Sequence, residues 1–341
     1  GRRASRRRRI HRAPVPIASR LHGGASIYDV AAQAGVSIVT VSRVFNDHPF
    51  VSDAMRERVL QASRQVGYTP RLVSKRCLIA VIVGHLDHLS AGDYKTRLLQ
   101  HLVRSAAGLG YLVEFIPYDS AHLATKHLVS ALLEVGLTSD EVRRLPDLPP
   151  VPKVAINKCD VDGDWSYVCS DHHDETATAV RHLMDHGHRR VALVLDEARG
   201  WGVERRREGY EQTLRERGDA SFDPLVLYSA DSSPRDMAVR MRDAGCTGCV
   251  NLTDNFGFAV MDALCNDLGV RVPDDLSMIC LEHASVSAFL RPRLTTVAQP
   301  LEDIARLAVD GIRDRIERRA PPFTITLKSQ LVPRHSVRTL G

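Results

Sequence analysis

The side chains best placed to contact another molecule follow Ser37, which comes directly after a tight turn. Ile38 and Val39 cannot donate or accept hydrogen bonds, but they can pack against thymine methyl groups. Arg43, four residues beyond Val39, can reach the O6 and N7 atoms of guanine. These residue types therefore indicate base contacts in a DNA major groove, provided that Ile38 and Val39 do not face the protein interior.

Hydroxyl and amide side chains around the same turn suit a second task, which is to anchor phosphate groups. Such contacts set the register of a protein on DNA without reading the sequence. The N-terminal amides of the first and third helices predicted below would add backbone N–H donors. The predicted phosphate contacts are Thr40, Ser42, Asn46 and Ser52.

Three short helices are predicted to position these groups. The residues that can cap or end the helices are Ser26, Ser37, Ser52 and Gly67. An Ala34-Gly35-Val36 turn separates the first two helices, and this spacing sets the second helix across the first. Val41 and Val44 already supply the inward face of the second helix, so Ile38 and Val39 are left for the groove.

The segment resembles the DNA-binding headpiece of the LacI/GalR family of bacterial repressors. The matching residues are Tyr28-Asp29-Val30-Ala31, Ala34-Gly35-Val36-Ser37, Thr40-Val41-Ser42-Arg43-Val44, Asn46, Val51-Ser52, Arg56, Val59 and Gly67-Tyr68-x-Pro70. By position, Ile38 and Val39 match the specificity pair of that family. The resemblance also implies DNA contacts for Tyr28, Ser37 and Arg43.

The rest of the chain is similar to the effector domain of the same family, so the resemblance covers roughly residues 26–337. The matching stretches are Leu183-x-x-x-Gly187-His188-Arg189-Arg190-Val191-Ala192, Arg206-x-x-Gly209-Tyr210, Val272-Pro273-Asp274-Asp275-Leu276-Ser277 and Leu294-Thr295-Thr296-Val297-x-Gln299-Pro300. The resemblance implies a core like the type I periplasmic binding proteins, which closes around a small molecule.

Apolar runs alternate with helical patterns after residue 77, which predicts parallel sheets covered on both faces. The strand-like runs are Leu78–Val83, Leu112–Ile116, Val154–Ile156, Val191–Leu195, Leu225–Leu227, Cys249–Leu252 and Met278–Leu281. The helical patterns include Tyr94–Leu109, His122–Val135, Glu175–His186, Val203–Arg217, Pro234–Ala244, Asn255–Leu268 and Leu301–Arg318. Whether the interior strand near Glu134–Thr138 is shortened or absent stays open.

The predicted fold is an all-α, three-helix helix-turn-helix headpiece joined to an α/β core of two interleaved Rossmann-like subdomains. We expect a basic disordered tail at residues 1–25, the headpiece at 26–70, a hinge at 71–77 and the effector-binding and dimerisation core at 78–341. Ligands of open parallel sheets bind at the carboxyl ends of the strands, so two facing sheets would form a cleft.

The resemblance implies six effector contacts in that cleft. Arg206 matches the ligand-anchoring arginine of the family, and its fork of donors suits hydroxyl groups or a carboxylate. Trp165 could stack on a sugar ring or a base, or it could be an ordinary loop aromatic. The remaining predicted contacts are Asn157, Thr253, Asp254 and Glu282, several of which differ from the usual residue of the family.

The hinge departs from the family pattern. Family members insert a leucine into the minor groove after the proline, and the counted position here is Cys77. Ile79 lies only nine positions after Pro70, so either the hinge helix and the tether form one short connector, or Leu72 or Leu78 acts as the wedge.

Charge is unevenly distributed along the chain. Residues 1–25 contain eight arginines and no acidic residue, and residues 26–76 carry a net charge of +3. Because the whole chain carries +5, residues 77–341 carry −6. A basic N-terminal part on an acidic body fits a surface that faces phosphates. No long apolar run predicts a membrane span or a secretory signal, so we expect a cytoplasmic protein.

Other chemistries are less well supported by the sequence. The Cys246-Thr247-Gly248-Cys249 pair leads into a predicted strand, whereas a redox pair usually lies at a helix N-terminus. His182 and His186 share a helix face but lack the carboxylate of a metal motif. We therefore expect no catalytic or metal site, no cofactor and no enzyme activity.

The sequence predicts a homodimeric transcription regulator, with repression as the expected mode, that binds a palindromic DNA operator and responds to a small, sugar-like effector. Two headpieces are needed because one contacts only a few base pairs. The alternatives are a DNA-binding regulator that needs no ligand, and a small-molecule-binding protein without regulatory coupling.

Overall fold

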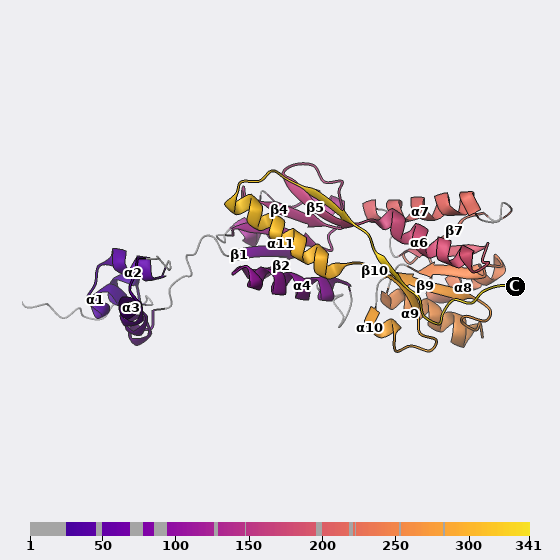
Figure 1. Ribbon diagram of the computed structural model, residues 1–341, viewed down its shortest axis with the longest axis horizontal. Helices are drawn as coiled ribbons and strands as arrows, with labels where there is room; N and C mark the ends of the chain where they lie inside the picture. The colour runs from indigo at the N-terminus through magenta and orange to yellow at the C-terminus, as the bar shows by residue number, and fades with distance from the viewer. Residues whose placement is uncertain are drawn as a thin grey trace, which may run out of the picture. The chain divides into compact units, whose positions relative to one another are not determined.

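The computed structural model describes residues 25–45, 50–68, 78–84, 94–125, 129–146, 148–195, 200–217, 221, 223–251, 254–281 and 284–341. The chain divides into two compact units, with the division between Ser74 and Lys75. The first unit is helical, and the second contains parallel sheets (Figure 1). No helix in the described part of the chain is both long and apolar enough to cross a bilayer.

The N-terminal unit consists of three helices around one apolar centre, as the sequence predicts. They are α1 (Ile27–Ala34), α2 (Ile38–Phe45) and α3 (Asp53–Val66). Gly35 ends α1 in the left-handed conformation with φ +61°, which a residue without a Cβ atom adopts at little cost. Val41 and Val44 of α2 are buried against α1 and α3, which fixes the face that α2 turns outward.

The first core sheet has six parallel strands in the order β11-β5-β4-β3-β1-β2. Its strands are β1 (Leu78–Val83), β2 (Leu112–Pro117), β3 (Ala131–Val135), β4 (Lys153–Ile156), β5 (Trp165–Ser170) and β11 (Thr324–Leu327). Helices α4 (Tyr94–Gly108) and α11 (Leu301–Glu317) pack together on one face (Figure 1). The other face is covered by the 3-10 helix η2 (Tyr118–Thr125), the short α5 (Ser139–Arg143) and their loops.

The second sheet has the order β12-β10-β9-β8-β6-β7, and only the pairing of β12 with β10 is antiparallel. Its strands are β6 (Val191–Leu195), β7 (Leu225–Tyr228), β8 (Gly248–Asn251), β9 (Ser277–Leu281), β10 (Thr295–Ala298) and β12 (Gln330–Val332). Helices α6 (His172–Asp185) and α7 (Trp201–Arg217) cover one face. On the other face lie α8 (Pro234–Asp243), α9 (Asp254–Asp262) and the π-helical turn η3 (Ala263–Asp267). The short helix α10 (Ala284–Ser287) precedes β10.

The chain passes between the two sheets three times, at 171, at 299–300 and at 328–329. The first passage joins β5 to α6, the second joins β10 to α11, and the third joins β11 to β12 (Figure 1). The interleaved core predicted from the sequence is therefore present. Each passage leaves a carboxyl end of a strand, so polar residues from distant parts of the chain meet there.

The predicted helix over His122–Val135 is wrong. The structure has the 3-10 helix η2 at its start and the fully buried strand β3 at its end. β3 pairs with both β1 and β4, so the interior strand left open by the sequence is present. An apolar run buried on both faces of a parallel sheet has no alternation, and therefore resembles part of a buried helix. Strands β5, β10, β11 and β12 were not predicted either.

Candidate functional site

The first candidate site is the outer face of α2. The Thr40 backbone N–H donates to Ser37 Oγ at 3.1 Å, so Ser37 caps α2 as predicted. Within the N-terminal unit Ile38 is 40% exposed and Val39 is 59% exposed, although both are aliphatic. Arg43 is also exposed. The structure thus leaves the predicted base-contacting side chains outside the apolar centre of their own unit, as a groove-reading helix requires.

Three of the four predicted phosphate contacts are among the described residues, and they lie on α2 or at the start of α3. Ser52 Oγ accepts a hydrogen bond from the Met55 backbone N–H at 3.4 Å and so caps α3. Thr40 and Ser42 are half-buried on α2, and Tyr28 is exposed on α1. Asn46 and Leu72 lie outside the described residues, as does the whole predicted hinge at 71–77.

Leu78 does not fit the wedge role that the sequence left open for it. It is the first residue of β1, pairs with Leu112 of β2, and packs against a buried cluster that contains Ile116 and Leu132. A side chain held in a sheet cannot also be inserted between base pairs without breaking this strand pairing. We therefore remove Leu78 from the predicted DNA contacts.

The second candidate site lies in the core, where the carboxyl ends of the strands meet the passages between the sheets. Asn157 follows β4 and has a left-handed backbone with φ +57°, which asparagine tolerates better than most residues. Its Nδ2 donates to Gln299 Oε1 at 2.9 Å and to the Tyr94 hydroxyl, and its Oδ1 accepts from the Ser170 backbone N–H at 2.8 Å. Asn157 therefore links its own loop to three other segments: the start of α4, the end of β5 and the passage after β10.

A buried charged cluster lies beside this asparagine. Glu175 accepts hydrogen bonds from His172 Nδ1 at 2.9 Å and from Ser329 Oγ at 2.6 Å, and Arg206 Nη2 lies 3.5 Å from Glu175 Oε2. Burial, followed by the nearby charge of Arg206, lowers the pKa of His172, which keeps its ring neutral near pH 7. Burial alone would raise the pKa of Glu175, but these three partners hold it below its usual range. Glu175 is thus an ionised anchor for Arg206.

Arg206 has a donor available at this site. Its side chain is 19% exposed, and its Nε is buried without a hydrogen-bond partner among the described residues. The α7 helix brings it close because Gly209 packs against α6, where an added Cβ would lie 2.2 Å from the His173 carbonyl oxygen. The Tyr210 hydroxyl, which donates to the Val191 carbonyl oxygen at 2.7 Å, fixes α7 on the sheet.

Comparison with known proteins shows which family has these two sites. Residues 26–71 match the model of the bacterial regulatory proteins of the lacI family, and residues 180–337 match a periplasmic-binding-protein-like domain. A regulator of the helix-turn-helix type from the aml 5' region of Streptomyces limosus is 30% identical over 84% of this chain and 87% of its own length. The chain belongs to the LacI/GalR family. It is accordingly a DNA-binding transcription regulator.

Two solved structures of transcription regulators have the same architecture. The cellobiose complex of the transcriptional regulator CelR is 26% identical, with a TM-score of 0.68 over 92% of this chain and 99% of its own. A lac repressor dimer bound to operator and the anti-inducer ONPF has a TM-score of 0.74 over 93% of this chain and 100% of its own. At 23% identity, the second likeness shows the fold alone.

Trp165 does not join the other predicted effector contacts of this LacI/GalR core. It is the first residue of β5 and pairs with Lys153, whereas Asn157 follows the last residue of β4, four residues further on. At about 3.3 Å per residue, the two lie roughly 13 Å apart along the strands. Trp165 is buried and belongs to the apolar cluster on the face of the sheet that η2 and α5 cover. This cluster also includes Val161.

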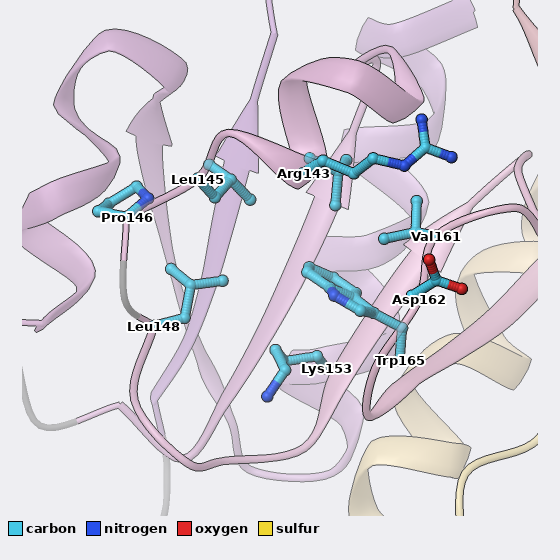
Figure 2. Close-up of a pocket in the computed structure, with 9 residues that line it drawn as sticks. Arg143, Leu145, Pro146, Leu148, Lys153, Val161, Asp162 and Trp165 are labelled. Atoms are coloured by element: carbon cyan, nitrogen blue, oxygen red, sulfur yellow. The ribbon is translucent and has the colours of Figure 1, made fainter.

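Figure 2 shows the ring of Trp165 directed toward Leu145 and Leu148, beside a cavity of about 360 Å³. Lys153 and Arg143 also line this cavity. Lys153 and Trp165 are the first residues of β4 and β5, so the cavity lies by the amino ends of these two strands, whereas Asn157 follows the carboxyl end of β4. We therefore do not retain Trp165 as an effector contact.

The structure describes only one of the three other predicted effector contacts, and of that one only its backbone. Thr253 and Glu282 lie outside the described residues, and Asp254 is described only as the first residue of α9. In the same core, sequence reasoning missed five polar residues that the structure brings into hydrogen bonds with Asn157 or within the Glu175 cluster, namely Tyr94, His172, Glu175, Gln299 and Ser329. The Thr296-Val297-x-Gln299-Pro300 match to the family was the only signal that pointed to one of them.

The cysteine pair and the histidine pair singled out in the sequence both lie in the second half of the core of this family member. Cys246 and Cys249 are buried in the apolar core of the second sheet, where burial raises the pKa of both thiols. The rings of His182 and His186 contact each other on α6. Within the described ranges, no group of three or more His, Cys, Asp or Glu side chains is arranged to hold a metal ion.

Proposed function

We propose that this regulator binds a palindromic operator as a homodimer through α2, and that a small polyhydroxyl ligand in the core cleft changes its affinity for DNA. The observation that carries the DNA half of this proposal is the exposure of Ile38 and Val39 at the start of a capped helix. Apolar side chains in this position can pack against thymine methyl groups in the major groove. Arg43 and the hydroxyl groups of Ser37, Thr40, Ser42 and Ser52 supply the polar contacts, and Tyr28 lies exposed on the neighbouring helix.

The exposed apolar side chains at the edge of the first sheet support a dimer. β2 is an edge strand, with Leu112 57% exposed and Phe115 43% exposed, and Val103 of the preceding α4 is 40% exposed. An apolar edge of this kind favours pairing with another chain. A second copy of the chain is the partner that a palindromic DNA site requires.

The cleft supports an uncharged or weakly charged polar ligand. Arg206 Nε and Ser170 Oγ are both buried without a hydrogen-bond partner among the described residues, and a ligand with several hydroxyl groups could satisfy them. Ser170 donates its backbone N–H to Asn157, so these two residues lie together at the carboxyl ends of β4 and β5. The cellobiose complex of CelR shows that a sugar binds a protein with the same fold.

We propose residues 26–70 as the DNA-binding domain, 71–77 as the hinge and 78–341 as the effector-binding and dimerisation core. The basic residues at 1–25 would add affinity for DNA of any sequence. The relatives named above are regulators, which supports our expectation that the chain performs no catalysis.

Selection of binding sites from random duplex DNA tests the DNA half of the proposal. The wild-type chain should enrich a palindromic sequence, whereas the double variant Ile38→Ala, Val39→Ala should bind duplexes without preference and with strong dependence on salt. Leu60, which is 36% exposed on α3, provides the matched control as Leu60→Ala. An unchanged sequence preference in the double variant would refute the assignment of α2.

Release of the selected operator by mono- and disaccharides, followed by fluorescence anisotropy, tests the effector half. Arg206→Ala should raise the sugar concentration needed for half-maximal release by roughly tenfold to hundredfold, because a charged donor is lost. Arg205→Ala is the control, since the ion pair of Arg205 within the described part of the chain is with the exposed Glu208 on the same helix. If no sugar alters operator affinity, the ligand-independent alternative is favoured; if no duplex is selected, the alternative without regulatory coupling is favoured.

A further inference from the structure

Two cysteines of the core lie unusually close together beside the cleft. The Sγ atoms of Cys159 and Cys169 are 2.7 Å apart, and both residues are free thiols. Cys159 is in the loop that follows β4, and Cys169 is the penultimate residue of β5. The C-x-x-C spacing that drew attention in the sequence is elsewhere, at Cys246 and Cys249, so this pair is created by the pairing of β4 with β5.

We propose that Cys159 and Cys169 form an intramolecular disulfide when the protein meets a hydroperoxide, so that the core contains a redox-sensitive site next to Asn157. A disulfide requires the two sulfur atoms to approach to about 2.05 Å, which is a small movement from the observed separation. The link would close a loop between neighbouring strands and would therefore require little change in the fold.

The surroundings of the two sulfur atoms give them different roles. Cys159 is half-buried and so remains accessible to a small oxidant, whereas Cys169 is buried. The hydrogen bond between the two thiols, assisted by the charge of Lys158, lowers the pKa of Cys159 against the opposing effects of burial and Asp160. The same hydrogen bond, together with burial, raises the pKa of Cys169. Cys159 is thus the thiolate that reacts first, and Cys169 is the resolving thiol.

The reaction balances with one hydroperoxide for each disulfide. The Cys159 thiolate attacks the terminal peroxide oxygen, the O–O bond breaks, and the departing oxygen leaves as an alcohol or water after taking a proton. The Cys169 sulfur then attacks the Cys159 sulfur, the S–S bond forms and the S–O bond breaks. The hydroxide that leaves takes the Cys169 proton and becomes water. Two thiols are oxidised, and the peroxide is reduced by two electrons.

The position of the disulfide connects it to the cleft. Ser170, which directly follows Cys169, donates its backbone N–H to Asn157 Oδ1, and Asn157 is two residues before Cys159. A bond between the sulfur atoms would therefore restrain the loop that carries Asn157. The proposal does not depend on which ligand occupies the cleft, so its failure would leave the proposed function untouched.

Peptide mass spectrometry of the full-length dimer tests the proposal. Trypsin cleaves after Lys158 and Arg181, so one peptide contains Cys159 and Cys169 and no other cysteine. After treatment with a stoichiometric amount of hydrogen peroxide, unfolding and alkylation, this peptide should be lighter than the reduced peptide by two hydrogen atoms and carry no alkyl group. Dithiothreitol should restore both alkylation sites. A peptide that stays fully alkylated, or that carries only sulfinic acid, would overturn the proposal.

Two variants and an internal control complete the test. Cys169→Ser should leave Cys159 as a sulfenic acid that dimedone traps, while Cys159→Ser should leave Cys169 unmodified at the same peroxide dose. Cys246 and Cys249 are the internal control, because both thiols are buried and should remain alkylatable. The thermal midpoint of the wild-type core should rise on oxidation and that of each variant should not. A fall in the wild-type midpoint would contradict a disulfide that fits the native fold.

Discussion

Asn157 Nδ2 donates a hydrogen bond to Gln299 Oε1 at 2.9 Å, although 142 positions separate the two residues in the chain. Asn157 follows a strand of the first sheet, and Gln299 follows β10 of the second sheet. The bond therefore crosses the boundary between the two halves of the core at one of the three chain passages. A ligand in the proposed cleft would contact this bond, so its strength bears on both stability and response.

Replacement of Asn157 by alanine should lower the free energy of unfolding of the core by about 2–4 kcal/mol, because hydrogen bonds are lost and alanine is placed at φ +57°. Asn157→Gly separates the two causes, since glycine accepts this backbone but makes no side-chain bond. Urea denaturation should rank the proteins as wild type, Asn157→Gly and Asn157→Ala in order of decreasing stability. Equal stability of all three would show that these hydrogen bonds contribute nothing to the stability of the junction.

Removal of one partner of a buried ion pair next to Asn157 should strongly lower the free energy of unfolding of the core. Lys158 Nζ lies 2.5 Å from Glu134 Oε1, and their side chains are 6% and 0% exposed. Lys158→Met should destabilise the core by about 3–5 kcal/mol, because the Glu134 carboxylate is left buried without its cation.

The double variant Glu134→Gln, Lys158→Met should recover most of that loss in the same denaturation assay. The side-chain carbonyl of the introduced glutamine can still accept the hydrogen bond that Glu134 Oε1 receives from the Ile156 backbone N–H at 2.9 Å. The single variant Glu134→Gln completes the comparison. If the stability lost in the double variant equals the sum of the losses in the two single variants, the two charges are not coupled.

The stability of the core should fall as the pH is lowered through the histidine range. Burial, as the largest cause, lowers the pKa of His172, His182 and His188. The unfolded chain, whose histidines titrate near about pH 6.5, then binds more protons than the native core, so protonation favours unfolding. The contribution is present above that pH and decreases below it.

Urea midpoints measured between about pH 7.5 and about pH 5.5 should therefore decrease steadily. The lowered pKa of Glu175 keeps that carboxylate charged throughout this window, so it should not contribute to the slope. His188→Gln should give a shallower slope than the wild type. A midpoint independent of pH would contradict neutral, buried histidines.

Gly209→Ala should impair the effector response without touching the ligand. The new Cβ would lie 2.2 Å from the His173 carbonyl oxygen, so α7 must move away from α6 and carry Arg206 with it. We expect a loss of roughly 1–3 kcal/mol in stability, from overpacking, and a weaker release of operator by sugar. Gly108→Ala is the control, because that exposed helical position has no atom within 4 Å of the added Cβ and alanine favours helices.

Much of the DNA-binding unit could be predicted from local sequence. The caps at Ser37 and Ser52, the Gly35 turn, and the inward Val41 and Val44 all depend on interactions within a few residues, and the structure confirms each of them. The alternation of strands and helices likewise predicted the two sheets. Each of these features follows from repeating hydrophobic spacing and from backbone groups that must be satisfied locally.

The cleft depended on the tertiary structure. The buried run Ala131–Val135 carried no periodicity that separates a strand from a helix, and the place of Trp165 depended on its register with Lys153. Gln299, which bonds to Asn157, and Ser329, which bonds to Glu175, come from segments more than a hundred residues away in the chain. Sequence spacing encodes which face of an element is apolar, but only the order of strands and the three chain passages determine which polar ends meet.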